Sequence, residues 1–365
     1  MMKILIIGAG AGGVTAAADL LSQGFDVSVY ELPEFQQNLF TMIKAGKIKV
    51  IGERNFISPI PDIKNTIEDA MEEADSVLVM THASSHIQIA SLIAPHIKDG
   101  QSVVLVPGYT GGALVFEKVF KQQGVRASYI LAETNTLPYA CRKIAGESAV
   151  LMKLYVEKFL VSAFPASKNE EFYSAFKQIY PNAVLTEDVL ATGFNNGNPV
   201  LNVAPVVFNA GRIEHAHGEY YHFQEGVTPS VARVLEQIDE ERMKVGRHYG
   251  IDVIPYLERV IETGYVKTND TWYDMISTSP HLSAKGPNDL DHRYLTEDVP
   301  FGLVPWIALA RKANIKVDLM ESLVHLSSAL KQENYLVAGR KLEEMGIENL
   351  SREEIKHYLQ TGRME

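Results

Sequence analysis

A glycine-rich turn near the start of the chain constrains the fold more than any other stretch. Lys3–Ile7 is a short and almost wholly apolar run, typical of a strand buried on both faces of a parallel sheet. Gly8, Gly10 and Gly13 follow with GxGxxG spacing, and residues 14–21 then have the pattern of a small-residue helix. The first glycine permits a tight turn, the second lets the backbone approach a pyrophosphate, and the third allows close helix packing. The sequence therefore predicts a helix N-terminus that presents free N–H groups to phosphates.

An acidic residue follows the next apolar run, residues 25–30. Glu31 stands about 20 positions after the first glycine, where dinucleotide-binding proteins place the carboxylate that accepts the ribose hydroxyls. A carboxylate repels a 2′-phosphate, and Leu32-Pro33-Glu34 offers no arginine or lysine to bind one. We therefore predict NAD as the cofactor, with NADP less favoured.

Apolar runs alternate with helical patterns through the first half of the chain. The further expected strands are 48–51, 75–80, 102–106 and 128–133, with one more strand region at 153–164. The helices expected between them are 35–45, 62–74, 87–97 and one that opens at Gly111-Gly112. Strands that alternate with helices predict an α/β Rossmann fold, a doubly wound parallel sheet, over residues 1–187.

Ligands of such sheets bind at the carboxyl ends of the strands. This rule selects Thr81, Pro107 and Glu133, which lie at the ends of three predicted strands, as cofactor-binding residues beside the glycine turn and Glu31. Ordinary turn chemistry explains each of the three equally well when it is taken alone.

The second half of the chain, residues 188–365, has the pattern of an all-α domain. Thr228-Pro229 is a helix start, because threonine caps and proline suits the first helical position. We also expect Asp318 to cap a helix with a core stripe of leucines at 319, 323, 326 and 330. A helical domain after a nucleotide domain predicts that the substrate binds in the cleft between them.

Composition and charge narrow the class of partner. The chain has 34 lysines and arginines against 45 acidic residues, a formal net charge of −11, which argues against a nucleic-acid or anionic-membrane surface. A single cysteine, Cys141, excludes an intramolecular disulfide and fits a reducing compartment. No apolar run approaches the roughly 18 residues that a membrane span needs. We expect a cytoplasmic protein whose partners are small molecules, and the oligomeric state stays open.

Polar side chains suited to chemistry gather in three stretches of the helical half. Residues 195–202 are rich in asparagine, and Asn198 and Asn202 are four apart, so they share a helix face. Residues 214–222 are crowded with histidines and carboxylates. Residues 292–298 place an arginine ahead of a pair of acids.

These features together resemble the octopine/nopaline (opine) dehydrogenase family, within the broader 6-phosphogluconate dehydrogenase-like superfamily, along essentially the whole chain. Besides the glycine fingerprint, the matching stretches are 107–114, 133–142, 209–212, 225–230 and 293–305. The resemblance implies an NAD(P)-dependent dehydrogenase that condenses an amino acid with a 2-oxo acid, through an imine, to an N-(carboxyalkyl) amino acid.

The resemblance also assigns roles to residues. Arg293 and Asp298 match the family's substrate arginine and its acidic partner, and a guanidinium suits bidentate binding of a carboxylate. An interdomain salt bridge for Arg293 and a helix cap for Asp298 are the alternatives. The family's catalytic histidine, four residues after Asn198, is replaced here by Asn202. Histidine moves a proton near neutral pH, whereas asparagine only donates or accepts hydrogen bonds.

The replacement leaves three functions open. The leading hypothesis is reduction of the imine, with Arg293 on the carboxylate, Asp298 and Asn202 on the reacting group, and Asn198 in support. The second is reduction of a free 2-oxo acid or ketone, as in ketopantoate reductase or glycerol-3-phosphate dehydrogenase. The third is a catalytically impaired nucleotide-binding sensor, which only the asparagine at position 202 supports.

Histidines elsewhere in the helical half offer two further alternatives. His217, His222 or His292 could move the proton instead, although a loop or surface role suits each of them better. A metal site at His215, His217 and His222 is conceivable, but their spacing matches no standard zinc pattern. We therefore predict no metal.

Overall fold

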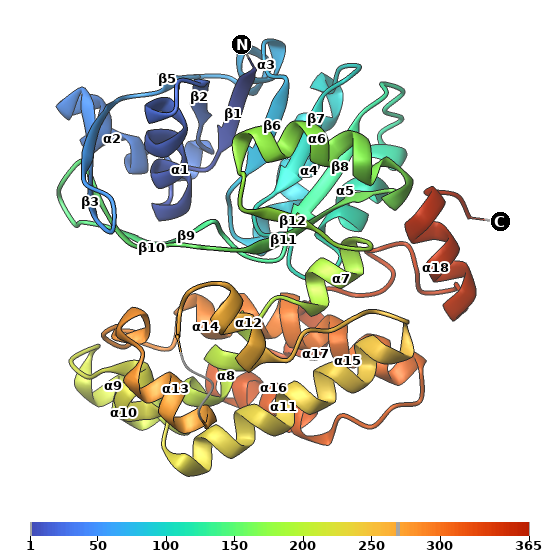
Figure 1. Ribbon diagram of the computed structural model, residues 1–365. Helices are drawn as coiled ribbons and strands as arrows, with labels where there is room; N and C mark the ends of the chain where they lie inside the picture. Colours follow the sequence, from blue (N-terminus) through green and yellow to red (C-terminus); the bar gives the residue numbers. More distant parts are fainter. Residues whose placement is uncertain (1, 268–270, 365) are drawn as a thin grey trace. The chain divides into compact units, whose positions relative to one another are not determined.

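The computed structural model describes residues 2–267 and 271–364, which form two compact units (Figure 1). The sheet unit comprises the described residues up to Gly108, Gly112–Val189 and Tyr358–Arg363. The helical unit comprises Tyr109–Gly111 and the described residues between Leu190 and His357. The predicted boundary, between residues 187 and 188, lies two residues before the observed break after Val189. Two short segments depart from this division, because Tyr109–Gly111 belongs to the helical unit and Tyr358–Arg363 to the sheet unit.

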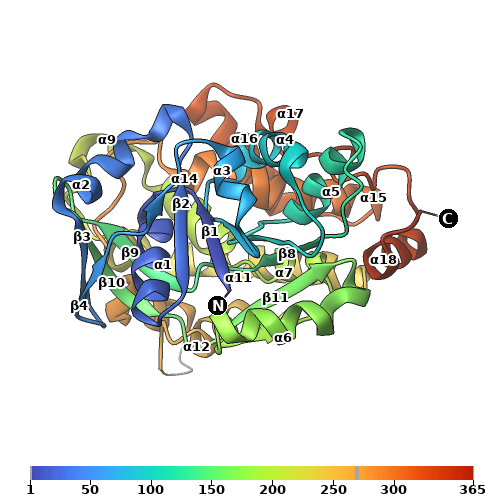
Figure 2. The same ribbon diagram turned by 90° about the horizontal axis from the view of Figure 1, so that it is seen from above.

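An eight-stranded sheet forms the centre of the sheet unit, and its strands β1 and β2, in blue, lie side by side in both views (Figures 1 and 2). Across the sheet the strands are β12 (Ala183–Leu185), β11 (Phe159–Phe164), β8 (Ile130–Thr134), β7 (Ser102–Leu105), β6 (Ser76–Val79), β1 (Lys3–Ile7), β2 (Asp26–Tyr30) and β5 (Asp62–Ile63). The six strands from β8 to β5 are parallel, and β1 and β6 are almost completely buried. The predicted Rossmann architecture is confirmed.

Two strands run against the parallel direction. β11 pairs with β8 in antiparallel register, and β12 pairs with β11 in parallel register, so both run opposite to the other six strands. Between β8 and β11 the chain makes an antiparallel pair, β9 (Tyr139–Lys143) and β10 (Ala149–Tyr155), instead of the helical crossover that a parallel strand requires. The chain therefore re-enters the sheet from the end at which it left, so the sheet is mixed and not wholly parallel.

A second, four-stranded sheet covers α1 (Ala11–Ser22), the helix after the glycine turn. Its order is β4 (Phe56–Pro59), β3 (Lys47–Gly52), β10, β9, and α1 packs against both sheets. The buried Asp19 of α1 accepts two hydrogen bonds from this second sheet, each at 2.8 Å. One comes from the hydroxyl of Tyr139 in β9 and the other from Arg54 in the turn between β3 and β4. The strand predicted at 48–51 therefore exists but belongs to this sheet, and the region 153–164 divides between the two sheets.

Helices make up the rest of the structure. In the sheet unit the remaining helices are α2 (Gln37–Ala45), α3 (Ile67–Glu72), α4 (His86–Ile93), α5 (Gly112–Gln122) and α6 (Asn169–Ile179). After the sheet come α7 (Val189–Phe194), α8 (Asn198–Phe208), α9 (Ala210–Ala216), α10 (His222–Gly226), α11 (Pro229–His248), α12 (Tyr256–Glu262), α13 (Trp272–Thr278), α14 (Arg293–Thr296), α15 (Val304–Lys312), α16 (Asp318–Lys331), α17 (Tyr335–Ala338) and α18 (Arg352–Thr361). The predicted all-helical second half is confirmed. No helix in the described residues is long and apolar enough to cross a membrane.

The apolar helix α8 is the centre of the helical unit and packs against α10, α11, α14 and α16. Thr228 caps α11 as predicted, with its hydroxyl accepting the N–H of Val231. At α16 two expectations were wrong. Asp318 is the first helical residue, and the Glu241 carboxylate on α11 accepts the first N–H groups instead. The buried stripe is Met320, Leu323, Val324 and Ser327, because Leu326 and Leu330 face outward and are 47% and 39% exposed.

Candidate active site

The glycine turn leaves open space where a phosphate would approach. Gly8 has φ +109°, and a Cβ on it would lie 2.7 Å from the carbonyl oxygen of Met80. A Cβ on Gly13 would lie 1.9 Å from the carbonyl oxygen of Gly8, so these two positions need glycine for internal reasons. A Cβ on Gly10 would meet nothing within 4 Å, and this residue directly precedes α1, which has no side-chain cap at its start. The turn therefore fits a dinucleotide pyrophosphate at the helix N-terminus.

Glu31 lies at the end of β2, against the same turn. The residue is 5% exposed, and its carboxylate accepts hydrogen bonds from Ala9 N at 2.8 Å, Leu32 N at 3.0 Å and Asn38 Nδ2 at 3.2 Å. The sequence placed this acid next to the glycine turn, and the structure brings the two together. The arrangement fits a ribose of the dinucleotide.

Three other predicted cofactor residues lie at or just beyond the carboxyl ends of neighbouring parallel strands. Thr81 follows β6, and its hydroxyl accepts a hydrogen bond from Ser85. Pro107 follows β7. Glu133 is fully buried in β8, where its carboxylate accepts the N–H of Ala113 near the start of α5 at 2.8 Å. Glu133 thus has an internal partner, and cofactor contact by these three residues stays a prediction.

In the helical unit, several polar groups converge on Asp298. Asn202 on α8 donates from Nδ2 to Oδ2 at 2.7 Å, and the hydroxyl of Tyr109 donates to Oδ1 at 2.7 Å. Nη1 of Arg293 donates to the Tyr109 oxygen at 3.1 Å and to Glu297 at 3.0 Å. Asp298 itself is 0% exposed and directly precedes a π-helical turn, Val299–Leu303. The structure therefore unites three predicted catalytic residues, separated widely in sequence, in one network.

Burial raises the pKa of the Asp298 carboxyl to about 6, while Arg293 and the hydrogen bonds from Asn202 and Tyr109 oppose the rise. A buried carboxyl that titrates near neutral pH and lies in a convergent polar cluster is characteristic of a functional site. The network can thus hold either a carboxylate or a neutral acid close to physiological pH.

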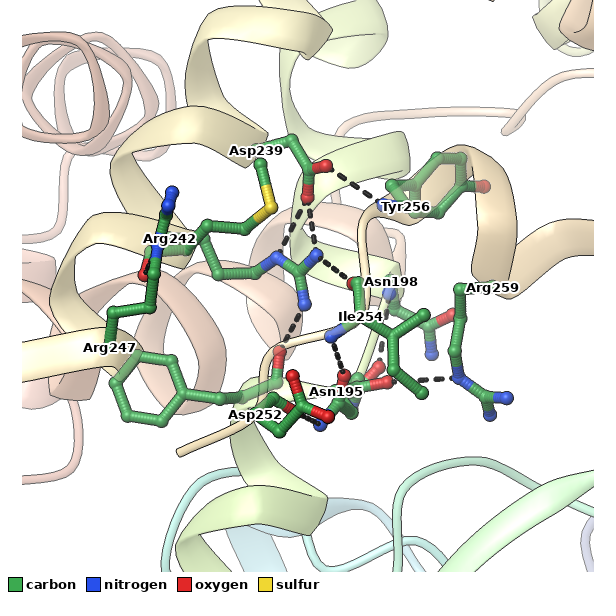
Figure 3. A network of polar contacts seen from close by, with 12 residues as sticks. Asn195, Asn198, Asp239, Arg242, Arg247, Asp252, Ile254, Tyr256 and Arg259 are labelled. Atoms are coloured by element: carbon green, nitrogen blue, oxygen red, sulfur yellow. Dashed lines mark hydrogen bonds and ion pairs between the residues drawn. The ribbon is translucent and has the colours of Figure 1, made fainter. Parts of the chain in front are cut away.

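Asn198 lies apart from that cluster, at the first residue of α8. Its N–H donates to the side chain of Asn196 at 3.0 Å, which fixes the start of the helix. Just before it, Asn195 binds Ala191 O, Asp252 O and Ile254 N and so joins α7 to the loop ahead of α12 (Figure 3). The structure thus brings Asn198 one helical turn from Asn202, but not into the Asp298 network.

A second buried network supports the start of α8. Arg242 on α11 donates to Asp239, to the carbonyl oxygen of Phe194 and to that of Ile254 at 2.8 Å, as Figure 3 shows. The other carboxylate oxygen of Asp239 accepts the N–H of Tyr256 at 2.8 Å. These contacts fix the junction of α7 and α8, and with it the position of Asn202.

Tyr109 is the site residue that sequence reasoning missed. It is 2% exposed and has φ 56°, a left-handed conformation that is uncommon outside glycine. Such backbone strain gathers at functional sites. The only available signal was its place in the family-like stretch 107–114, where a tyrosine does not stand out among the glycines.

The candidate histidines have structural partners. His222 is 1% exposed, its Nδ1 lies 2.9 Å from the hydroxyl of Tyr220, and its ring stacks on Tyr294. Burial, and then the nearby His292, lowers its pKa to about 3, so it stays neutral. His292 caps α14, and His217 ends α9. Within 2–267 and 271–364 no three histidine, cysteine or acidic side chains are grouped to hold a metal ion.

Comparisons with known proteins agree along the whole chain. The alpha-helical domain of NAD/NADP octopine/nopaline dehydrogenase matches residues 185–331, and the ketopantoate reductase family matches residues 4–130. An opine dehydrogenase of Arthrobacter sp. (strain 1C) is 30% identical, with 95% of each chain covered. The protein ocs of Agrobacterium tumefaciens (strain Ach5) is 24% identical, over 95% of this chain and 96% of its own.

Solved structures show the same fold. Octopine dehydrogenase in complex with NADH and agmatine superposes with a TM-score of 0.79 at 18% identity, covering 100% of this chain and 99% of its own. Apo yersinopine dehydrogenase gives a TM-score of 0.75 at 13% identity, with the same coverage. With the glycine turn, Glu31 and the Asp298 network in place, and a relative 30% identical along 95% of both chains, the protein is an NAD-dependent oxidoreductase that belongs to the octopine/nopaline (opine) dehydrogenase family.

Proposed function

We propose that this enzyme condenses an amino acid with a 2-oxo acid and reduces the resulting imine to a secondary amine. The balance is one amino acid, one 2-oxo acid, NADH and a proton, giving an N-(1-carboxyalkyl) amino acid, NAD⁺ and water. NADH, when bound at the glycine turn and Glu31, supplies the hydride. The chain's own side chains bind and orient the imine.

Arg293 holds a substrate carboxylate in this proposal. Its Nη1 donates hydrogen bonds to Tyr109 and Glu297, while Nε and Nη2 have no hydrogen-bond partner among the described residues. The side chain is 35% exposed, so part of it reaches solvent. A guanidinium fixed on one edge and open on the other is suited to a bidentate carboxylate contact.

The orientation of Asn202 is the observation that carries the proposal, because it favours an imine over a ketone. Since a carboxylate only accepts hydrogen bonds, the contact with Asp298 assigns Nδ2 to that side and leaves Oδ1 to face a substrate. An acceptor stabilises the N–H of a protonated imine, which needs no acid during hydride transfer. A ketone develops an alkoxide instead, which needs a donor such as histidine.

Asn198 is assigned a supporting contact with the substrate. It lies one helical turn before Asn202, and its side chain makes no hydrogen bond to the described residues. Substrate binding between the two domains and a cytoplasmic location stay predictions within this proposal.

NADH oxidation, measured across pairs of amino acids and 2-oxo acids, tests the function. We expect turnover only when both substrates are present, and a product that contains the amine nitrogen. Equal NADH oxidation with a 2-oxo acid or ketone alone would establish the reductase alternative. No turnover with any pair, despite NADH binding, would leave the sensor alternative.

The variant Asn202→His separates an adapted site from a degraded one. A general acid–base contributes roughly 100-fold or more to a rate. If the site is adapted to asparagine for imine reduction, we expect Asn202→His to change the condensation rate by less than this factor. Asn202→Leu removes both polar atoms and is expected to abolish turnover. A gain of 100-fold or more with histidine would instead mark the natural site as impaired.

A further inference from the structure

A lysine from the second sheet lies beside the glycine turn. Lys143, the last residue of β9, donates from Nζ to the carbonyl oxygen of Asn38 at 2.9 Å and to that of Ala9 at 3.3 Å. Its side chain is only partly exposed. A strand more than 100 residues from the glycine turn thus brings a cation to the place where the adenosine end of a dinucleotide is expected.

Two residues connect this cation to Glu31. The N–H of Ala9 and the side-chain amide of Asn38 donate to the Glu31 carboxylate, while the carbonyl oxygens of the same residues accept from Lys143. The ammonium and the carboxylate are therefore near neighbours. Burial lowers the pKa of Lys143, and the charge of Glu31 opposes that change.

The carboxylate of Glu31 has little acceptor capacity left for a ribose. A carboxylate offers about four lone-pair positions, and three N–H donors already occupy positions on Glu31. At most one ribose hydroxyl can then bind Glu31 in this arrangement. One part of the usual basis for rejecting NADP, an acid that binds both ribose hydroxyls, is therefore weakened here, while the repulsion between that acid and a 2′-phosphate remains for a nearby cation to offset.

We propose that Lys143 is a second determinant of cofactor choice, whose ammonium binds the 2′-phosphate of NADPH beside Glu31 and so lets the enzyme use both cofactors. A lysine binds phosphate as a compact, strongly hydrated charge with three rotatable donors. This inference concerns the cofactor alone and holds for either reaction considered above.

Equilibrium binding without substrate tests the inference. Dissociation constants for NADH and NADPH are measured on the wild type and on Lys143→Met, which keeps the aliphatic stem and removes the charge. We expect NADPH binding to weaken by about tenfold or more, as loss of a charge-assisted contact implies, and NADH binding to change by less than about threefold. The matched control is Lys153→Met, a partly buried lysine of β10 in the same sheet.

Adenosine fragments separate the phosphate contact from an effect on the glycine turn. Lys143→Met should lose affinity for 2′,5′-ADP and keep its affinity for 5′-AMP, and Lys143→Arg should retain both. Equal losses for both fragments, with an unchanged unfolding temperature, would show that Lys143 only positions the turn and would overturn the proposal. Failure of the wild type to bind NADPH would overturn it as well. Neither result depends on which substrates the enzyme condenses.

Discussion

Asp298 is shielded from solvent and accepts one hydrogen bond on each carboxylate oxygen, so its protonation changes the network directly. The proton converts an acceptor into a donor that faces Tyr109 or Asn202, both of which already donate. With a pKa of about 6, we expect kcat/KM to fall as the pH drops below 6. The pH–rate profile of Asp298→Asn should lack this acidic limb. A profile that is flat down to pH 5 in the wild type would contradict the assignment.

The same carboxyl has an opposite effect on stability. Its pKa in the folded state, about 6, lies above the ordinary value of 3.8 for an aspartate side chain, so the folded state binds more protons between these values. Ionisation of Asp298 therefore costs stability as the pH rises from about 4 through 6. Urea titrations of the wild type and Asp298→Asn should show a difference that grows over this range and is constant above it.

Removing the Tyr109 hydroxyl should move the acidic limb. Tyr109→Phe deletes one donor to the ionised form of Asp298, a hydrogen bond of about 1.5–3 kcal/mol. The pKa of Asp298 should then rise by about one unit or more. Tyr249→Phe removes another buried hydroxyl of the same unit, one bound to the carbonyl oxygen of Leu309, and is the matched control. An unshifted limb in Tyr109→Phe would show that the contact does not act on Asp298.

The resemblance to the opine dehydrogenase family identified Asn202, Arg293 and Asp298, but the sequence could not establish their contacts. Tyr109 was missed for a physical reason. Its role depends on a left-handed backbone and on a partner 189 residues away, and neither leaves a local pattern. Lys143 leaves no local pattern either, because it reaches the glycine turn from a strand more than 100 residues away in sequence.

At the level of elements, the buried pair of Asp239 and Arg242 supports the junction of α7 and α8. Asp239→Ala leaves the arginine buried without its partner, and loss of one member of a buried pair costs about 3–5 kcal/mol. Urea unfolding should detect that loss. In the control Glu321→Ala, which breaks the largely exposed Arg311–Glu321 pair, we expect about 1 kcal/mol or less. Equal effects would contradict the assigned importance of burial.

Most helices and central strands were predictable, because apolar periodicity and capping residues act locally. The second sheet was not, since β3 pairs with β10 across about 100 residues and nothing near residue 48 indicates which sheet a strand joins. The leucine stripe of α16 failed for a related reason. Periodicity shows that a helix has an apolar face, but neighbouring elements determine which positions they cover.

For the whole molecule, two glycines of the same turn have different roles, because Gly13 is needed for folding and Gly10 for cofactor binding. Gly10→Ala places its Cβ in open space, so we expect the unfolding temperature without ligand to be unchanged. The added methyl group blocks the approach of a pyrophosphate, so NADH should no longer stabilise this variant. In the wild type, NADH at 100 times its dissociation constant should raise the free energy of unfolding by about 2.7 kcal/mol. Gly13→Ala should destabilise the protein even without NADH, because its Cβ would overlap the carbonyl oxygen of Gly8. Normal NADH stabilisation of Gly10→Ala would contradict this model of the turn.

The sheet unit is discontinuous in sequence, because Tyr358–Arg363 belongs to it and the ring of Tyr358 lies 5.0 Å from that of Phe164 in β11. During synthesis, about 170 residues separate the emergence of Val189 from that of this segment. At about 5–20 residues per second, the wait is on the order of 10 to 30 seconds. Through that interval the contact between α18 and β11 stays unmade in the nascent sheet unit, so the helical unit must be synthesised before the cofactor domain is complete.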